Sequence, residues 1–162
     1  DKIKNLLKNP KNLYDSVNSL SVENSQLKKE IDILNSEKII VIKNDILKHL
    51  TNKSGLNTYS SIIDLKPSKI KDLCFSIGAE IKNAFLILVI KDNNKVYCSC
   101  FISKDIASSK KLNASEIISE LSSYINGKGG GQPFYATCAG DNVSGIDKLI
   151  LEAKKLQNQL QK

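Results

Sequence analysis

Apolar residues recur every seven positions along the first part of the chain. One series consists of Leu13, Leu20, Leu27, Leu34 and Val41, and a second, three residues earlier in each repeat, consists of Val17, Asn24, Ile31 and Lys38. Leu in one series, with branched residues and a single Asn in the other, is typical of a parallel two-stranded coiled coil. The pattern therefore predicts a self-associating helix with a contact seam of Leu13, Val17, Leu20, Asn24, Leu27, Ile31 and Leu34.

The helix is expected to be long but not uniform. Asn9-Pro10 is a favourable helix start, and neither Gly nor Pro follows until Gly55. Lys38 and Asp45 break the heptad pattern, and apolar residues cluster instead between residues 39 and 50 (Ile39, Ile40, Val41, Ile42, Ile46, Leu47 and Leu50). We predict that the first half forms the coiled coil and the second half packs on a globular part. The alternative is a long amphipathic helix that folds back entirely on its own domain.

After Gly55 the pattern alternates between short strands and helices. We expect strands at 59–65, 84–90, 96–102 and 134–138, with a hairpin turn at Asn93-Asn94. Helices are expected from Pro67, from Asn113 or Ser115, and from about Ser144 to the end. The predicted fold class is α+β (mixed α/β): a long N-terminal helix followed by a small sheet with packed helices. The predicted domains are residues 1–54, for dimerisation and linkage, and residues 55–162, the globular domain.

Charge adds little to this picture. The net charge is +7, and all 24 basic residues are Lys. A bias toward Lys, Asn and Ile indicates an AT-rich genome, so the positive charge permits nucleic-acid binding without demonstrating it. Met is absent even at position 1, so we expect a piece of a longer protein.

Several classes of function are disfavoured. Cys74, Cys98, Cys100 and Cys138 lack zinc-ligand spacing, and the single His49 has no Cys or His neighbour, so no metal site is expected. The longest apolar run, 84–90, is too short to span a bilayer. With no visible signal peptide, a cytoplasmic location is expected. Neither a nucleotide-binding fingerprint nor a catalytic set is present, so we predict that the fragment is not an enzyme.

The segment Gly127-Lys128-Gly129-Gly130-Gly131-Gln132-Pro133 is the most informative stretch. Without Cβ atoms, backbone N–H groups can approach a phosphate closely, and Lys128 adds a positive charge. The glycines follow a helix and precede a strand, which is the reverse of the order in P-loops and dinucleotide-binding folds. We predict a helix-to-strand loop, either phosphate-binding or merely flexible. Phe134 or Tyr135 beside it is a candidate for base stacking, with strand alternation placing the other in the core.

Residues 126–140 resemble the closing motif of alanyl-tRNA synthetases, in which a Gly-rich segment precedes an aromatic or Asp residue, Ala and a small-residue turn. Leu6–Pro10, Val22–Ile31 and Leu65–Ile77 are similar to the linker, the long helix and the short helix of the C-terminal region of that family. The same domain type accompanies DHH phosphoesterases. The resemblance covers nearly the whole chain, and the glycine motif is its most specific part.

The resemblance implies a function. In this family the long helix dimerises and the globular domain binds the outer corner of tRNA-Ala, which tethers the tRNA between the aminoacylation and editing sites. The nucleic-acid-binding residues would be Gly127, Lys128, Gly129, Gly130, Gly131 and Gln132. The parent would be an alanine–tRNA ligase that uses ATP, magnesium and zinc, whereas this fragment would need no cofactor.

The sequence departs from the family at two places. Gln132 replaces an Arg that many members have, and 111–114 lacks a common glycine. A neutral Gln binds phosphate less strongly than a bidentate Arg. Two alternatives remain open: a coiled-coil assembly module without nucleic-acid binding, and the nucleic-acid-binding end of a DHH-type phosphoesterase.

Overall fold

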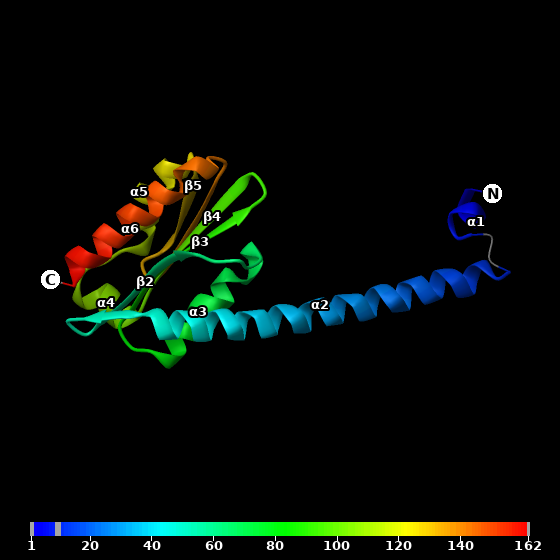
Figure 1. Ribbon diagram of the computed structural model, residues 1–162, viewed down its shortest axis with the longest axis horizontal. Helices are drawn as coiled ribbons and strands as arrows, with labels where there is room; N and C mark the ends of the chain where they lie inside the picture. Colours follow the sequence, from blue (N-terminus) through cyan, green and yellow to red (C-terminus); the bar gives the residue numbers. More distant parts are fainter. Residues whose placement is uncertain (1, 9–10, 162) are drawn as a thin grey trace. The chain divides into compact units, whose positions relative to one another are not determined.

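The computed structural model describes residues 2–8 and 11–161, which divide into two compact units, Asp1–Lys38 and Ile39–Lys162. The first unit holds α1 (Lys2–Leu6) and most of the 37-residue helix α2 (Leu13–His49) (Figure 1). The division between the units falls inside α2. The predicted start at Asn9-Pro10 lies outside the described residues. Within them, the Asn12 side chain accepts a hydrogen bond from the Tyr14 backbone N–H (3.0 Å) and caps the helix.

The second unit contains a six-stranded sheet in the order β1-β2-β3-β4-β6-β5. The strands are β1 (Thr51–Lys53), β2 (Leu56–Ile62), β3 (Ala84–Asp92), β4 (Lys95–Ile102), β5 (Lys128–Gln132) and β6 (Tyr135–Gly140). β2 and β3 are parallel, because helix α3 connects them, and every other pairing is antiparallel. The α+β class is confirmed.

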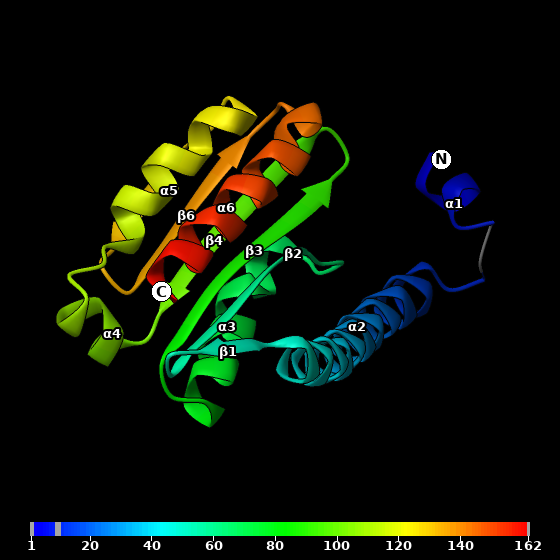
Figure 2. The ribbon, with the colours of Figure 1, turned by 60° about the vertical axis from the view of Figure 1, so that its left-hand side comes forward.

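The remaining helices cover the two faces of the sheet. α3 (Ile70–Glu80), entered through the 3₁₀ turn η1 (Pro67–Lys69), lies on one face. α5 (Ala114–Ser122) and α6 (Ile146–Leu160) lie on the other face (Figure 2). Shorter pieces are α4 (Lys104–Ser109) and the 3₁₀ turns η2 (Ser123–Ile125) and η3 (Val143–Gly145).

Most local elements follow the sequence pattern. The turn at Asn93 closes the β3–β4 hairpin with a left-handed φ of 52°. The Asn113 side chain accepts a hydrogen bond from the Ser115 N–H (3.0 Å), so Asn113 is the cap of α5. β1, α4 and β5 were not expected, and β2 begins three residues earlier than predicted.

The last turns of α2 belong to the globular unit, as the break in the heptads predicted. Ile46 is fully buried, and Ile39, Ile42, Leu47 and Leu50 pack on the core beneath α3. Lys43 forms an ion pair with Glu80 at the end of α3. Ile40 and Val41 were expected in the same cluster but are exposed, because they lie on the opposite side of the helix.

Two glutamines, Gln157 in α6 and Gln161 directly after it, hydrogen-bond to strands β1, β2 and β3. The Ser60 hydroxyl donates to Gln157 Oε1 (2.6 Å), and Gln157 Nε2 donates to the carbonyls of Phe85 (3.0 Å) and Tyr59 (3.2 Å). Gln161 Nε2 donates in the same way to β1 and β2. Gln157 is buried, so its amide has no access to water and its hydrogen-bonding capacity is satisfied by these protein groups.

The glycine segment is an edge strand and not the predicted loop. β5 pairs with β6, with Gly129 opposite Cys138, Gly130 opposite Thr137 and Gly131 opposite Ala136. A Cβ on Gly129 or Gly131 would collide with the backbone of β6, whereas a Cβ on Gly130 would meet only Ser115 Oγ, at 3.8 Å. The glycines are therefore needed for close approach between strands at two positions, and none of the three adopts a left-handed φ.

Replacing Gln157 by Ala is expected to lower the free energy of unfolding by about 1–3 kcal/mol, because buried polar partners lose their hydrogen bonds. Urea unfolding followed by circular dichroism measures the change. Gln159→Ala, an exposed position on the same helix, is the matched control and should change stability by less than about 0.5 kcal/mol. Equal effects of the two variants would contradict the anchoring role of Gln157.

Gly129→Ala and Gly131→Ala should each destabilise the protein by roughly 1–3 kcal/mol, because the new methyl group displaces β6. Gly130→Ala should be neutral or slightly stabilising, since its methyl group has space and the unfolded chain loses freedom. The same urea titration compares the three variants. A uniform loss across all three would show that packing against β6 is not the reason for the glycines.

Candidate functional site

The predicted site residues occupy one edge of the sheet. Gly127 precedes β5, where its N–H donates to the Ser122 carbonyl (2.8 Å), and Lys128, Gly129, Gly130, Gly131 and Gln132 form the strand. All five strand residues are exposed. In an antiparallel edge strand, alternate residues direct both N–H and C=O away from the sheet. The backbone is therefore accessible here, though along a strand and not around a loop.

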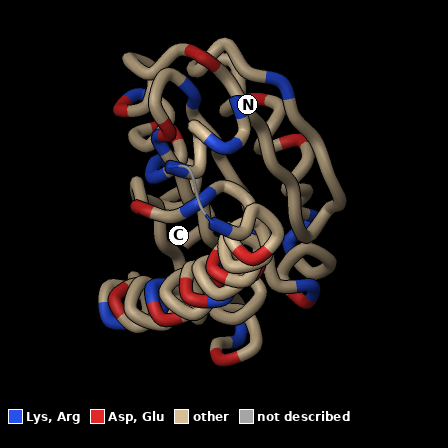
Figure 3. The backbone as a smooth tube through the Cα atoms, turned by 90° about the vertical axis from the view of Figure 1, so that its right-hand side faces the viewer, with Lys and Arg blue, Asp and Glu red and all other residues tan. Residues whose placement is uncertain are grey.

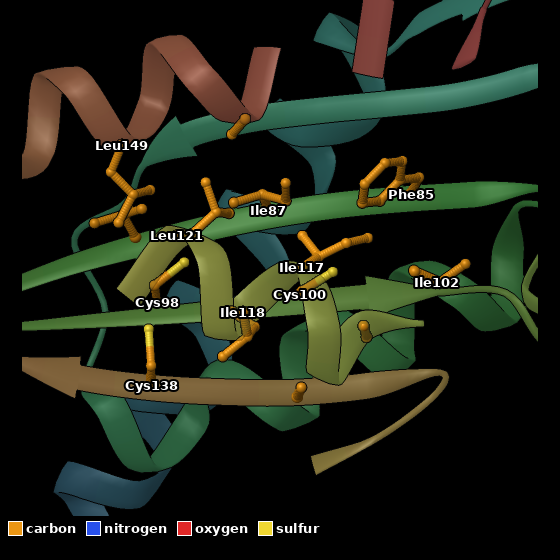
Figure 4. Packing of buried hydrophobic residues seen from close by; sticks show 14 of the residues in the cluster. Phe85, Ile87, Cys98, Cys100, Ile102, Ile117, Ile118, Leu121, Cys138 and Leu149 are labelled. Atoms are coloured by element: carbon orange, nitrogen blue, oxygen red, sulfur yellow. The ribbon is translucent and has the colours of Figure 1, made fainter. Parts of the chain in front are cut away.

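The two faces of this edge differ. Side chains of paired strands alternate between faces, and Cys98, Cys100, Ala136 and Cys138 point into the core beneath α5 and α6, together with Leu121 and Leu149 (Figure 4). The alternate positions of β4 and β6 face the α3 side, where Tyr97, Phe101 and Tyr135 border the second core. α3 contacts β6 through Phe75 and Lys71 at Tyr135. Further along, part of this second face is uncovered: Thr137, Ala139, Lys128 and Gly130 are all exposed.

A groove of about 640 Å³ lies on this uncovered face. Its lining comes from the start of α3 (Pro67, Ile70 and Lys71), from β4 (Tyr97 and Cys98), from β5 (Lys128, Gly129 and Gly130) and from β6 (Tyr135, Thr137, Cys138 and Ala139). None of the described residues that line it is acidic. Of the predicted site residues, the structure brings Lys128, Gly129 and Gly130 into the groove, while Gly127, Gly131 and Gln132 lie outside its lining.

The electrostatics of the groove favour anions. Lys71 and Lys128 contribute positive charge from its two sides, one from α3 and one from β5. The N-terminal end of α3 also lies at the groove, where Asp72 in its first turn offsets the partial positive charge of the helix N-terminus. Lysines elsewhere are interspersed with acidic residues along the chain (Figure 3), so the groove differs from its surroundings in lacking carboxylates.

Tyr135 forms a fixed wall of the groove. Its ring lies 5.5 Å from the Phe75 ring, and Lys71 Nζ lies 6.0 Å from its centroid. Burial raises the pKa of Tyr135 to about 12, only partly opposed by a hydrogen bond with Ser99, so the ring stays neutral at physiological pH. Phe134 lies in the turn before β6, half-buried beneath Lys104. Of the two aromatics, Tyr135 packs against the second core from β6 but stays half-buried, and Phe134 lies outside the alternating strand.

Sequence reasoning did not identify Lys71, Tyr97 or Thr137 as site residues. Lys71 and Tyr97 are far in sequence from the glycines and join them only through the pairing of β4 with β6 and the position of α3, whereas Thr137 is the partner of Gly130 in the β5–β6 pair. The available signal was in the sequence of β4, where Tyr97, Ser99 and Phe101 alternate with Val96, Cys98, Cys100 and Ile102. That alternation shows two faces but not which of them stays uncovered.

The thiols and the histidine do not form a reactive centre. Burial raises the pKa of Cys74 to about 12 and that of Cys100 well above its ordinary value, so both remain protonated thiols. Exposed His49 uses Nδ1 to donate to the Asp45 carbonyl (2.8 Å). Among residues 2–8 and 11–161, no group of three or more His, Cys, Asp or Glu side chains could hold a metal ion. No described helix is long and apolar enough to cross a membrane.

The predicted dimerisation residues lie along one stripe of α2, within the first unit. Val17, Leu20, Leu27, Ile31 and Leu34 are exposed, with half of the surface of Leu20 and of Leu27 accessible, and Leu13 is half-buried. Asn24 lies in the middle of the stripe and is also exposed. A stripe of large apolar side chains along a helix is unusual on a surface that remains in water.

Known proteins resemble this chain closely. The alanine–tRNA ligase of Flavobacterium psychrophilum is 40% identical over 151 residues, and that of Christiangramia forsetii is 37% identical over 154 residues. These matches cover 93% and 95% of this chain, but only 17% and 18% of the relatives, so the chain corresponds to under a fifth of their length.

Among solved structures, the C-Ala domain of Aquifex aeolicus alanyl-tRNA synthetase has the same fold, with a TM-score of 0.57 at 20% identity over 69% of this chain and 96% of that domain. The resemblance to alanyl-tRNA synthetases that the glycine motif indicated is therefore confirmed. The DHHA1 domain family matches residues 58–159, from within β2 to near the end of α6. The matched segment contains both the glycine strand and the groove. The chain belongs to the DHHA1 domain family.

Proposed function

We propose that the globular unit binds the outer corner of tRNA-Ala, and that α2 joins two chains, so that each tRNA is tethered between the aminoacylation and editing sites of a parent alanyl-tRNA synthetase. The observation that carries the tRNA proposal is the exposed glycine strand beside a carboxylate-free groove with Lys71 and Lys128 on its sides. The high identity to alanine–tRNA ligases supports tRNA-Ala as the ligand.

The glycine strand suits an RNA backbone for two reasons. Its outward N–H groups are not screened by side chains, so phosphate oxygens can reach them. A Cβ on Gly130 would have only Ser115 Oγ of α5 within 4 Å, so the backbone at this residue is not crowded by neighbouring atoms on that side. Gln132 supplies a neutral amide where many relatives would place an Arg, so we expect the isolated chain to bind weakly and the parent enzyme to add contacts elsewhere.

The parent's chemistry is part of the same proposal. We expect alanine activation, with its ATP, magnesium and zinc, to reside in other parts of a cytoplasmic parent enzyme, and the present chain to be a non-catalytic tRNA-binding part. No group among the described side chains combines a nucleophile with a neighbouring base in the groove, whose lining contains neither His nor carboxylate.

The dimer proposal rests on the exposed stripe of α2 and on its charges. With Leu20, Leu27 and Leu34 at d positions, Glu23, Glu30 and Glu37 occupy g positions and Lys28 occupies an e position. In a parallel dimer, Glu23 of one helix lies beside Lys28 of the other, and Asn24 meets its counterpart. An antiparallel pair would instead set glutamates against glutamates. The charges therefore favour a parallel pair of identical chains in register.

Titration of the purified chain with an alanine tRNA transcript at two salt concentrations tests the tRNA proposal. Affinity should fall roughly 10²–10³-fold between 50 and 200 mM salt, as about five phosphate contacts require. Gly130→Val should abolish binding without unfolding the chain, and Lys128→Ala should reduce the salt dependence by about one contact. Lys148→Ala, which removes the same charge from α6, is the control. A folded chain that binds no tRNA at 50 mM salt would be an assembly module only.

Sedimentation equilibrium tests the dimer proposal. The wild-type chain should sediment at twice its mass of 17.9 kDa. Replacing Leu20 and Leu27 by Ser should leave a monomer, because two layers of the seam lose their apolar contacts. Replacing Val22 and Ile33 by Ser removes equally exposed apolar residues outside the stripe and should preserve the dimer. A stable coiled coil would be ruled out if the wild-type chain, diluted 100-fold from a stock of about 1 mM, sedimented as a monomer.

A further inference from the structure

The face of β4, β6 and β5 on the α3 side has an ordered arrangement of side chains, buried at Ser99 and Phe101 of β4 and exposed along β6 and β5 except at Tyr135, which is half-buried. Strand pairing places them in three rows across the sheet: Tyr97, Ala139 and Lys128; Ser99, Thr137 and Gly130; and Phe101, Tyr135 and Gln132. In one outer row Tyr135 lies next to Gln132, in the other Ala139 separates Tyr97 from Lys128, and the middle row is small. We infer that this face is a stacking platform for unpaired RNA bases, with Tyr135 and Tyr97 as the stacking residues.

The shape of the site matches a flat ligand. The small middle row leaves a hollow between the two tyrosines, and the groove of about 640 Å³ falls within the usual range of small-ligand sites, about 300–1,000 Å³. Thr137 and Gly130, which are paired across β6 and β5, both belong to its lining and are small. Aromatic side chains on an open sheet face are a general means of binding bases, because every base has a π-face.

Tyr135 is prepared for this role before any ligand arrives. Its ring contacts Phe75, which also stacks edge-on against the buried Phe101 at 5.3 Å. Because this aromatic cluster fixes the ring, binding a base costs little side-chain entropy. Tyr97, in the first row, is likewise half-buried and anchored in the core beneath α3.

The flanking charges fit nucleotides better than an apolar ligand. Lys71 and Lys128 lie on opposite sides of the groove, so they can contact the phosphates that precede and follow a stacked base. The lining offers no carboxylate to repel those phosphates. Base faces are accessible in loops, bulges and ends but hidden within a regular duplex, so the platform should prefer unpaired RNA.

The opposite side of the molecule offers a matched control. Tyr124, half-buried against the other core, has Lys148 over its ring at 5.3 Å, which is the same pairing of a tyrosine with a lysine. Tyr124 and Lys148 lie away from the groove lining. Tyr124→Leu therefore removes an aromatic ring that is also half-buried, without touching the proposed platform.

This inference rests on the proposed tRNA function, and the experiment separates the two. The 162-residue chain and its Tyr135→Leu, Tyr97→Leu and Tyr124→Leu variants are titrated, at several salt concentrations, with the alanine tRNA transcript, with a 12-nucleotide oligouridylate and with a blunt 12-base-pair RNA duplex. Circular dichroism and urea unfolding confirm that each variant is folded.

Tyr135→Leu should weaken binding to the tRNA and to the oligouridylate about 5- to 100-fold, as expected for loss of one stacked base. The slope of log affinity against log salt should stay unchanged, because stacking releases no counterions. Tyr97→Leu should act in the same direction, and Tyr124→Leu should have no effect. All chains should bind the duplex more weakly than the oligouridylate, and neither Tyr135→Leu nor Tyr97→Leu should change the affinity for the duplex.

Two results would overturn the platform. If wild-type binding is strong and Tyr135→Leu leaves it unchanged, the chain holds RNA through the strand edge alone. If Tyr124→Leu weakens binding as much as Tyr135→Leu, the effect is not local to the groove. Absence of any RNA binding by the folded wild-type chain would instead overturn the proposed function itself.

Discussion

The antiparallel pairing of β4 with β6 is the constraint on which the rest of the globular unit depends. It joins segments separated by α4 and α5, and its register assigns every side chain of both strands to a face. Cys98 and Cys138 thereby enter the core beneath α5 and α6, while Tyr97 and Tyr135 turn toward α3. A slip of one residue would exchange the two sets, burying polar Thr137 and exposing the thiols, so the core on one face enforces the groove on the other.

The glycine strand shows how one sequence feature can meet two demands. Gly129 and Gly131 permit β5 to lie close against β6, and neither position tolerates a Cβ. Gly130 has no such structural restriction, although it lies between them and lines the groove. The packing of the sheet therefore accounts for two of the three glycines, and the proposed binding of a ligand to the backbone would account for the third.

The sequence was a good guide where the determinants are local. Heptad spacing, the Asn113 cap and the turn at Asn93 each depend on residues within a few positions, and the structure has the elements they predict. β5 could not be predicted in this way, because three glycines have little intrinsic preference for a strand and are held by pairing with β6. The burial of Gln157 could not be predicted either, since its partners Ser60 and Phe85 are distant in sequence.

The same distinction applies to the candidate site. The glycines and Lys128 stand out in the sequence, but the groove also needs Lys71 from α3 and Tyr97 from β4, which only the tertiary structure brings near. Sequence reasoning therefore located one wall of the site and described it as a phosphate loop, whereas the other walls are aromatic and add a chemistry that the glycine motif does not suggest.

This second chemistry bears on how a chain without arginine can hold RNA. Lysine contacts with phosphate weaken steeply as salt rises, and Gln132 provides no bidentate contact to compensate. The proposed stacking on Tyr135 would release no counterion, so its contribution would persist at physiological ionic strength. If α2 also joins two chains, each weak site acts beside the contacts of a larger assembly, and modest affinity is enough to keep a bound tRNA from diffusing away. The lysines would then govern how quickly RNA arrives and the tyrosines how long it stays.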